Sequence, residues 1–124
     1  APSNRDNGSM NMTRTLRRLE ATEADILKGC CDLLDARRIL YVRHSPISPV
    51  QGKGGIQFRR QRRSQLGAPD LIVFPKGKAD LMVEVKTLLG SQSRRQIEWQ
   101  NACEASGRRY VILRSVDELM ETLR

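Results

Sequence analysis

A hairpin formed by two short apolar runs constrains the fold of this chain most. The runs are expected as strands at about residues 70–75 and 80–86, and the intervening Pro-Lys-Gly-Lys stretch is typical of a turn. With the turn centred near Gly77, Asp70 lies directly opposite Glu84. The sequence therefore predicts a pair of carboxylates facing each other at one end of an apolar hairpin.

Side-chain alternation assigns this acidic pair to one face of the hairpin. Glu84 and Lys86 are two residues apart on one strand, so their side chains lie on the same face of the hairpin. Asp70 pairs with Glu84 across the hairpin, so its side chain lies on that face as well. Carboxylates paired in this way have Cβ atoms about 5 Å apart and repel each other. A divalent cation held by oxygen ligands, Mg²⁺ or Mn²⁺, would offset that repulsion. The alternative is structural, because strand ends often carry charge and Lys86 can neutralise Glu84.

The same face of the hairpin is expected to be largely core rather than solvent-exposed. The apolar residues that share it are Ile72, Phe74 and Met82. An acid pair at the edge of a core face is the arrangement that a metal site needs. In that site Asp70 and Glu84 would ligate the ion, and Lys86 would orient a water or stabilise the transition state of a phosphoryl reaction.

The first long helix supplies a third acid. A helical pattern runs to about Arg38 with a break near Thr22, and Glu23 lies within the apolar stripe of the part after the break. A carboxylate within such a stripe is costly unless it meets a cation or hydrogen-bond donors. Glu23 would then hold a water of the metal or a second ion. Alternatively, Glu23 only complements the helix dipole at the first turn.

The remaining pattern predicts a single α/β domain over residues 13–124, preceded by a tail at 1–12 that is expected to be disordered or a cloning remnant. The elements are expected in the order α-β-β-β-α-β-α, and the last crossover should place two strands in parallel. Outside the hairpin, strands are expected at 39–44 and 109–114, helices at 94–106 and 115–123, and a long loop or mobile arm at 45–66.

Gln96 opens the later helix within a Ser93–Gln96 capping box. It could also face the acidic site and contact a phosphate, because helix N-termini favour anions. We expect one rotamer to fill only one of these two roles.

Basic residues form a second group of candidate functional residues, besides the acidic site. The formal net charge is +8, and no acid occurs between Asp35 and Asp70. Such a balance favours a nucleic acid as partner, with an anionic membrane surface as a weaker alternative. Contacts to phosphates would give recognition of DNA shape rather than of base sequence. The residues expected to bind nucleic acid are Lys53, Arg59, Arg60, Arg62, Arg63, Arg94 and Arg95.

The number of cysteines and the hydropathy of the sequence indicate the cellular compartment of the protein. The odd count of three cysteines argues against a disulfide framework, and adjacent Cys30 and Cys31 are expected to be small core residues. No apolar run approaches the roughly 18 residues that a membrane helix needs, and no signal peptide is visible. We therefore expect a cytoplasmic protein.

These motifs together resemble a known family. Pro69-Asp70 followed by Glu84-Val85-Lys86 resembles the PD-(D/E)XK nuclease motif. The wider pattern resembles the VRR-NUC (virus-type replication-repair nuclease) branch through helical Glu23, Gly67-x-Pro-Asp-Leu-Ile, Gly90-x-x-Ser-x-x-Gln96-x-x-Trp99 and Gly107-x-x-Tyr110. The resemblance implies a mixed β-sheet flanked by helices. It also implies Mg²⁺ or Mn²⁺ bound through Asp70, Glu84 and Val85, with Lys86 catalytic and Glu23 and Gln96 as accessory residues.

Standalone members of that branch are similar to Holliday-junction resolvases and act as homodimers. The resemblance thus implies a metal-dependent, structure-selective DNA endonuclease that cuts branched DNA, in particular four-way junctions, as a homodimer. The alternatives are a nuclease of flaps or duplex ends and a non-catalytic basic DNA-binding module.

Overall fold

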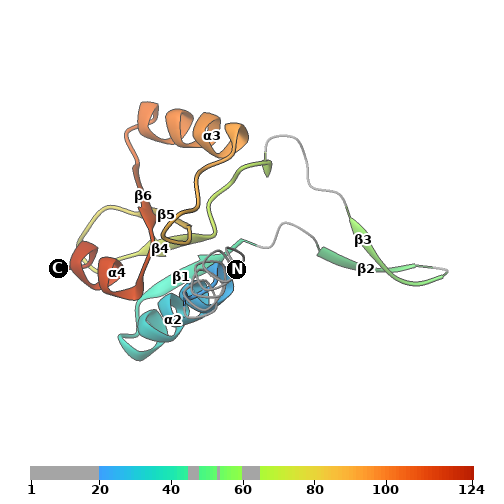
Figure 1. Ribbon diagram of the computed structural model, residues 1–124, viewed down its shortest axis with the longest axis horizontal. Helices are drawn as coiled ribbons and strands as arrows, with labels where there is room; N and C mark the ends of the chain where they lie inside the picture. Colours follow the sequence, from blue (N-terminus) through green and yellow to red (C-terminus); the bar gives the residue numbers. More distant parts are fainter. Residues whose placement is uncertain (1–19, 45–47, 53, 60–64) are drawn as a thin grey trace, which may run out of the picture.

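The computed structural model describes residues 20–44, 48–52, 54–59 and 65–124. Its centre is a four-stranded mixed sheet in the order β1-β4-β5-β6 (Figure 1). Strands β1, β4 and β5 are antiparallel neighbours, whereas β5 and β6 run parallel. The strand bounds are β1 Leu40–Arg43, β4 Leu71–Phe74, β5 Leu81–Val85 and β6 Arg109–Leu113. The predicted α/β fold with a mixed sheet is confirmed.

In the part of the chain that the structure describes, three helices pack on this sheet. Helix α2 (Glu23–Ala36) precedes β1, α3 (Arg94–Ala105) connects the parallel strands β5 and β6, and α4 (Val116–Thr122) ends the chain. Each starts at a residue whose side-chain oxygen accepts a backbone N–H: Thr22, Ser93 and Ser115. The Ser93 cap is the predicted one, and Thr22 and Ser115 lie where the sequence predicts a helical break and a helix start. The helical pattern expected before Thr22 lies largely outside the described residues, as does the tail at 1–12.

The register of the β4–β5 hairpin is the predicted one. Leu71 pairs with Val83 and Ile72 pairs with Met82, so the next positions outward are Asp70 and Glu84. The parallel pairing then sets Glu84 beside Ile112 of β6. Burial on both faces leaves every residue of β5 buried.

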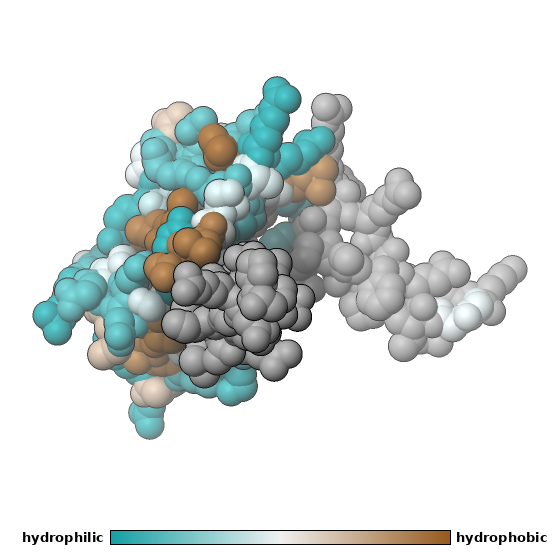
Figure 2. All heavy atoms as spheres, in the orientation of Figure 1, coloured by the Kyte–Doolittle hydropathy of each residue, from teal (hydrophilic) through white to brown (hydrophobic). Residues whose placement is uncertain are grey.

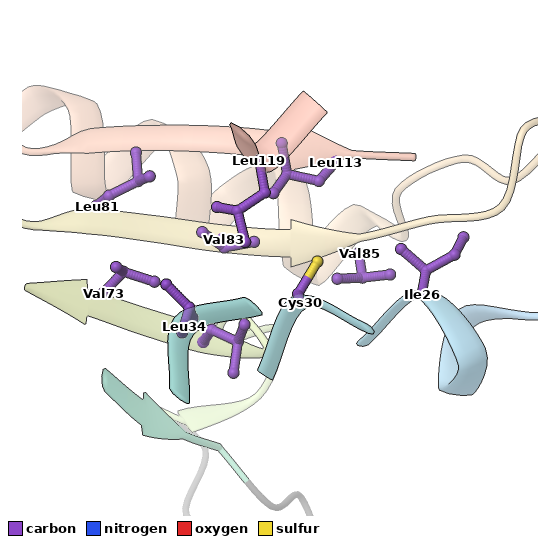
Figure 3. Packing of buried hydrophobic residues seen from close by; sticks show 10 residues of the cluster. Ile26, Cys30, Leu34, Val73, Leu81, Val83, Val85, Leu113 and Leu119 are labelled. Carbon is purple, nitrogen blue, oxygen red and sulfur yellow. The ribbon is translucent and has the colours of Figure 1, made fainter. Parts of the chain in front are cut away.

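Because side chains alternate along the strands, the sheet has one hydrophobic core on each of its two faces. On one face the strand residues meet α2 and α4, and Figure 3 shows Ile26, Cys30 and Leu34 of α2 directed at the sheet. On the other face Met82 packs with Cys103 and Tyr110 beneath α3, and Trp99 lies 6.3 Å from Tyr110 between ring centroids. The acidic residues share this second face, with Glu84 and Lys86 buried like Met82. The expectation that the acid face is largely core is therefore confirmed for β5.

Of the long loop or mobile arm expected at 45–66, the loop was wrong, because two strands form within this segment. Residues 48–59 form a second, two-stranded antiparallel sheet of β2 (Ser48–Gly52) and β3 (Gly55–Arg59), which lies apart from the main sheet (Figure 1). Pro49 and the glycines suggested a loop, but proline is tolerated in an edge strand and glycines suit a two-residue hairpin turn. Gly55, with φ of +106°, pairs with Gly52 across that turn.

The hairpin adds two strands to the predicted element order. Most of the predicted basic arm cannot be compared with the structure: Lys53, Arg60, Arg62 and Arg63 lie outside the described residues, and Arg59 is described only as the last residue of β3. Within the described ranges, no helix is long and apolar enough to cross a membrane.

Candidate active site

Asp70 is fixed immediately before β4 by two hydrogen bonds. Its carboxylate Oδ2 accepts the backbone N–H of Val85 at 2.8 Å, across the hairpin. Its carbonyl oxygen accepts the backbone N–H of His44, also at 2.8 Å, from the residue after β1. The side chain is thereby held against the end of β5, where Glu84 lies.

Glu84 is the most unusual group of the site. Its side chain is buried, with a residue exposure of 2%, and its Oε2 has no hydrogen-bond partner among the described residues. Burial, reinforced by the negative charge of Asp70, raises the pKa of Glu84 to about 8, although the positive charge of Lys86 opposes the shift. A buried carboxylate with an unsatisfied oxygen and a second carboxylate opposite is costly without a cation.

Lys86 lies between two glutamates. Its Nζ is 3.9 Å from Oε1 of Glu84 and 3.9 Å from Oε1 of Glu23. The Glu23 side chain is 52% exposed, whereas that of Lys86 is 10% exposed. The first turn of α2 therefore brings Glu23 to the site, as the helical stripe indicated, and its contact there is with Lys86.

Gln96 corrects one expectation. Its Oε1 accepts the backbone N–H of Ser93 at 2.8 Å and completes the capping box, while its Nε2 donates to Glu84 Oε1 at 2.8 Å. One rotamer thus fills both the capping role and a role in the site, which we had expected to be exclusive. The reason is that a primary amide carries an acceptor and donors at its two ends. Its contact in the site is with Glu84.

Gly67 explains how the loop before Asp70 reaches helix α3. It has a φ of +82°, and a Cβ at this position would lie 2.4 Å from the carbonyl oxygen of Arg95 and 2.8 Å from the backbone nitrogen of Gln96. Only a residue without a side chain allows this approach. The loop therefore packs on the first turn of α3 and brings Asp70 and Gln96 to the same place. The glycine two residues before Pro69 was the available sequence signal.

A hollow of about 200 Å³ opens above these groups. Five of its lining residues are not among the predicted site residues: His44, Gln65, Gly67, Ala68 and Ser93. The position of His44 at the end of a predicted strand was a signal, since the end of β1 lies beside the start of β4. The complete lining is His44, Gln65, Gly67, Ala68, Asp70, Glu84, Ser93 and Gln96.

Two further basic residues, Arg94 and Arg95, follow directly on a residue that lines the hollow. They follow the lining residue Ser93 in the first turn of α3, and both are exposed. Arg94 forms an i,i+4 ion pair with Glu98 at 3.2 Å. The helix therefore presents two cations beside the mouth of the hollow.

The residues present fit a divalent cation. The unsatisfied Oε2 of Glu84 and the facing carboxylate of Asp70 supply oxygen donors of the kind that Mg²⁺ and Mn²⁺ take. Across the described ranges, no three His, Cys, Asp or Glu side chains gather closely enough to form a metal cluster. Glu23 and the Val85 carbonyl therefore stay predictions as ligands, and the contact that the structure gives Glu23 is with Lys86.

This arrangement, a mixed sheet with an Asp, a Glu and a Lys at one end of a central hairpin, is a PD-(D/E)XK-like fold. In particular, the chain has the fold of a VRR-NUC domain. A solved structure described as a VRR_NUC domain superposes with a TM-score of 0.56 and 22% sequence identity, covering 82% of this chain and 97% of that one. The sequence matches no protein-family model and no curated protein sequence. The predicted resemblance is thus confirmed at the level of the fold.

Proposed function

We propose that this protein is a metal-dependent, structure-selective DNA endonuclease that cuts branched DNA, in particular four-way junctions, as a homodimer. The observation that carries the proposal is the buried Glu84 carboxylate, whose Oε2 lacks a partner among the described residues while Asp70 faces it. A DNA-binding module has no use for two repelling acids in this position. A phosphodiester hydrolase uses them to hold a cation.

Hydrolysis joins a water oxygen to the phosphorus and breaks one phosphorus–oxygen ester bond, leaving a phosphate and a hydroxyl end. A bound Mg²⁺ or Mn²⁺ neutralises phosphate charge and makes a water more acidic. Asp70, Glu84 and the Val85 carbonyl would hold it. Because Gln96 donates to Oε1 of Glu84, the unpartnered Oε2 would be the oxygen left to hold the ion.

Lys86 is the group that acts on the reacting atoms. Its ammonium, almost completely removed from solvent, would hold the attacking water or a phosphoryl oxygen as negative charge develops there. Glu23 stands on the other side of Lys86 and would position that ammonium. Gln96 positions Glu84 in the same sense, from the start of α3.

The DNA would be held through its phosphates. Arg94 and Arg95 lie beside the hollow, and the overall charge of +8 favours a polyanion. Two copies of a single-domain nuclease would make the paired cuts that resolve a junction, with one site for each strand.

The test uses end-labelled four-way-junction, flap and linear duplex DNA, each with Mg²⁺, Mn²⁺ or EDTA. Glu84→Gln removes one charge at nearly constant shape, and Asp32→Asn, an exposed acid paired with Lys28, is the matched control. Paired junction cuts that EDTA and Glu84→Gln abolish support the proposal. Cuts confined to flaps or duplex ends support the first alternative, and binding without cleavage under every metal supports the DNA-binding module.

A further inference from the structure

The turn that follows Lys86 exposes two adjacent leucines. Leu88 and Leu89 occupy its central positions, and their exposures are 68% and 79%. Central turn positions usually hold polar residues or glycine. On the face seen in Figure 2, hydrophobic residues lie in small patches among hydrophilic ones. A single exposed leucine is ordinary, but two at the tip of a turn beside a candidate active site indicate a contact surface.

The structure holds this turn firmly. The Gly90 N–H donates to the Thr87 carbonyl oxygen at 3.1 Å. From the end of β6, Nη1 of Arg114 donates to the carbonyl oxygens of Thr87 at 2.5 Å and of Gly90 at 2.7 Å, with that of Leu88 at 3.3 Å. The two leucines are therefore presented on a fixed backbone, which lowers the entropy cost of any contact that they make.

The turn also has a defined place relative to the site. Thr87 directly follows Lys86, and the turn ends three residues before Ser93, the N-cap of α3. The exposed Arg94 and Arg95 come next. The apolar tip thus lies in the chain between the lysine of the candidate site and two cations that suit phosphates.

We propose that Leu88 and Leu89 form a wedge that inserts between base pairs at the branch point of the DNA and unstacks them beside the cut. This inference rests on the proposed nuclease function, because its ligand is the branched DNA. Leucines are among the apolar side chains that enter base steps in this way. Unstacking costs least where the stack is already interrupted, as it is at a branch point.

The alternative to DNA as the partner of Leu88 and Leu89 is a second copy of this chain. Two side chains are far fewer than the about 20–30 residues that each partner contributes to a stable interface. The neighbouring Arg94 and Arg95 would also repel the same arginines of a second copy across a symmetric contact, whereas they attract DNA. Charge complementarity therefore favours DNA.

The test follows base stacking with 2-aminopurine in a four-way junction. One junction carries the probe at the branch point and a second carries it within an arm, both in EDTA so that cleavage plays no part. The variant Leu88→Thr/Leu89→Thr removes the wedge at constant charge. The control Leu40→Thr/Val42→Thr removes two comparably exposed apolar side chains of β1 (70% and 53%).

The wild-type protein should raise the fluorescence of the branch-point probe and leave that of the arm probe unchanged. Leu88→Thr/Leu89→Thr should lose this rise and bind the junction about tenfold more weakly, as expected for lost apolar contacts with the bases, while binding linear duplex equally well. The β1 control should behave as the wild type. Leu89→Ala repeats the test with a smaller change, and the melting temperature of each variant checks that it is folded.

Two results would overturn the wedge. One is a branch-point signal in the leucine variant equal to that of the wild type. The other is a change from dimer to monomer in light scattering, which would make the leucines a protein contact. If the wild type cuts junctions while the branch-point probe stays stacked, the wedge proposal is wrong and the nuclease proposal is supported. If the wild type binds no DNA, both proposals fail.

Discussion

Gln96 donates from Nε2 to Oε1 of Glu84 at 2.8 Å while its own Oε1 caps helix α3 through the N–H of Ser93. The start of a helix and the orientation of a buried acid thereby depend on one amide. Because the cap fixes the amide, Glu84 can turn only one oxygen toward Asp70. This coupling makes Gln96 a positioning residue of the proposed metal site.

Gln96→Glu should therefore destabilise the protein by about 2 kcal/mol at pH 8, since it sets a second carboxylate against the buried Oε1 of Glu84. At pH 5 the loss should be smaller, because a protonated Glu84 can donate to the new carboxylate. Urea unfolding at both pH values measures the difference. The control is Gln100→Glu: Gln100 donates to Glu104 in the same way at 2.8 Å but on an exposed surface, so its cost should be about 0.5 kcal/mol. Equal losses for the two variants would contradict the role of Gln96.

The raised pKa of Glu84 predicts a pH dependence of stability in the absence of metal. The folded protein holds the Glu84 proton up to about pH 8, whereas an ordinary glutamate releases it near 4.5. Between these values the folded state binds the extra proton, so the free energy of unfolding should fall as the pH rises, by up to about 1.4 kcal/mol per pH unit. Below this window the contribution is complete, and above it the contribution is lost.

Denaturant unfolding in EDTA from pH 4.5 to 8.5 tests this prediction. Glu84→Gln should remove most of the slope, and Mg²⁺ should reduce it in the wild type because the cation binds the ionised carboxylates. The exposed control Asp32→Asn should keep the wild-type slope. An unchanged slope in Glu84→Gln would mean that another group carries the dependence.

Gly67→Ala should be far more damaging than a change at another glycine of positive φ. At Gly67 (φ +82°) the new Cβ would lie 2.4 Å from the Arg95 carbonyl oxygen, so the loop must leave α3; we expect a loss of about 3 kcal/mol or more. At Gly77 (φ +70°) no heavy atom lies within 4 Å, and Gly77→Ala should cost only the backbone strain of about 1 kcal/mol. Thermal unfolding separates the two, and Gly67→Ala should also weaken Mn²⁺ binding in calorimetry. Similar melting temperatures would show that the loop does not depend on this contact.

The part of the site that lies on regular elements was predictable from sequence. The turn position fixed the register of Asp70 against Glu84, and the helical stripe placed Glu23 on the side of α2 that meets the sheet, because both follow from the periodicity of strand and helix. Of the two cysteines expected in the core, Cys30 is buried, and Cys31 is partly buried and packs against the same core.

The parts that escaped prediction depend on contacts between distant segments. The approach of Gly67 to Arg95 and the second contact of Gln96 require the packing of the loop on α3, which no local pattern contains. The β2–β3 hairpin was not predicted for another reason. Pro49 and the glycines of this segment are tolerated in an edge strand and a tight turn, but the same residues are also typical of loops.

Lys86 and Glu23 should differ in their effect on cleavage. Lys86→Met removes the buried cation that we propose acts on the developing charge, and we expect the single-turnover rate to fall about 100-fold or more while Mn²⁺ still binds. Glu23→Gln acts only through Lys86 from a half-exposed position, so its loss should be about tenfold or less. Lys28→Met, which removes an exposed lysine of α2, is the control and should cut at the wild-type rate. A Glu23→Gln loss equal to that of Lys86→Met would make Glu23 a direct participant, as a metal ligand would be.

Arg94 and Arg95 should contribute to the salt dependence of DNA binding. If each contacts one phosphate, Arg94→Gln/Arg95→Gln should reduce the slope of log affinity against log salt by about 2, on every DNA structure alike, because phosphate contacts release counterions without reading sequence. The control Arg37→Gln/Arg38→Gln removes the same charge from the far end of α2, about 20 Å along the helix from Glu23, and should change the slope little. Fluorescence anisotropy between low and moderate salt measures both. Equal slopes for the two double variants would mean that the positive charge acts only as a general field, and that the mouth of the hollow is not where the DNA backbone lies.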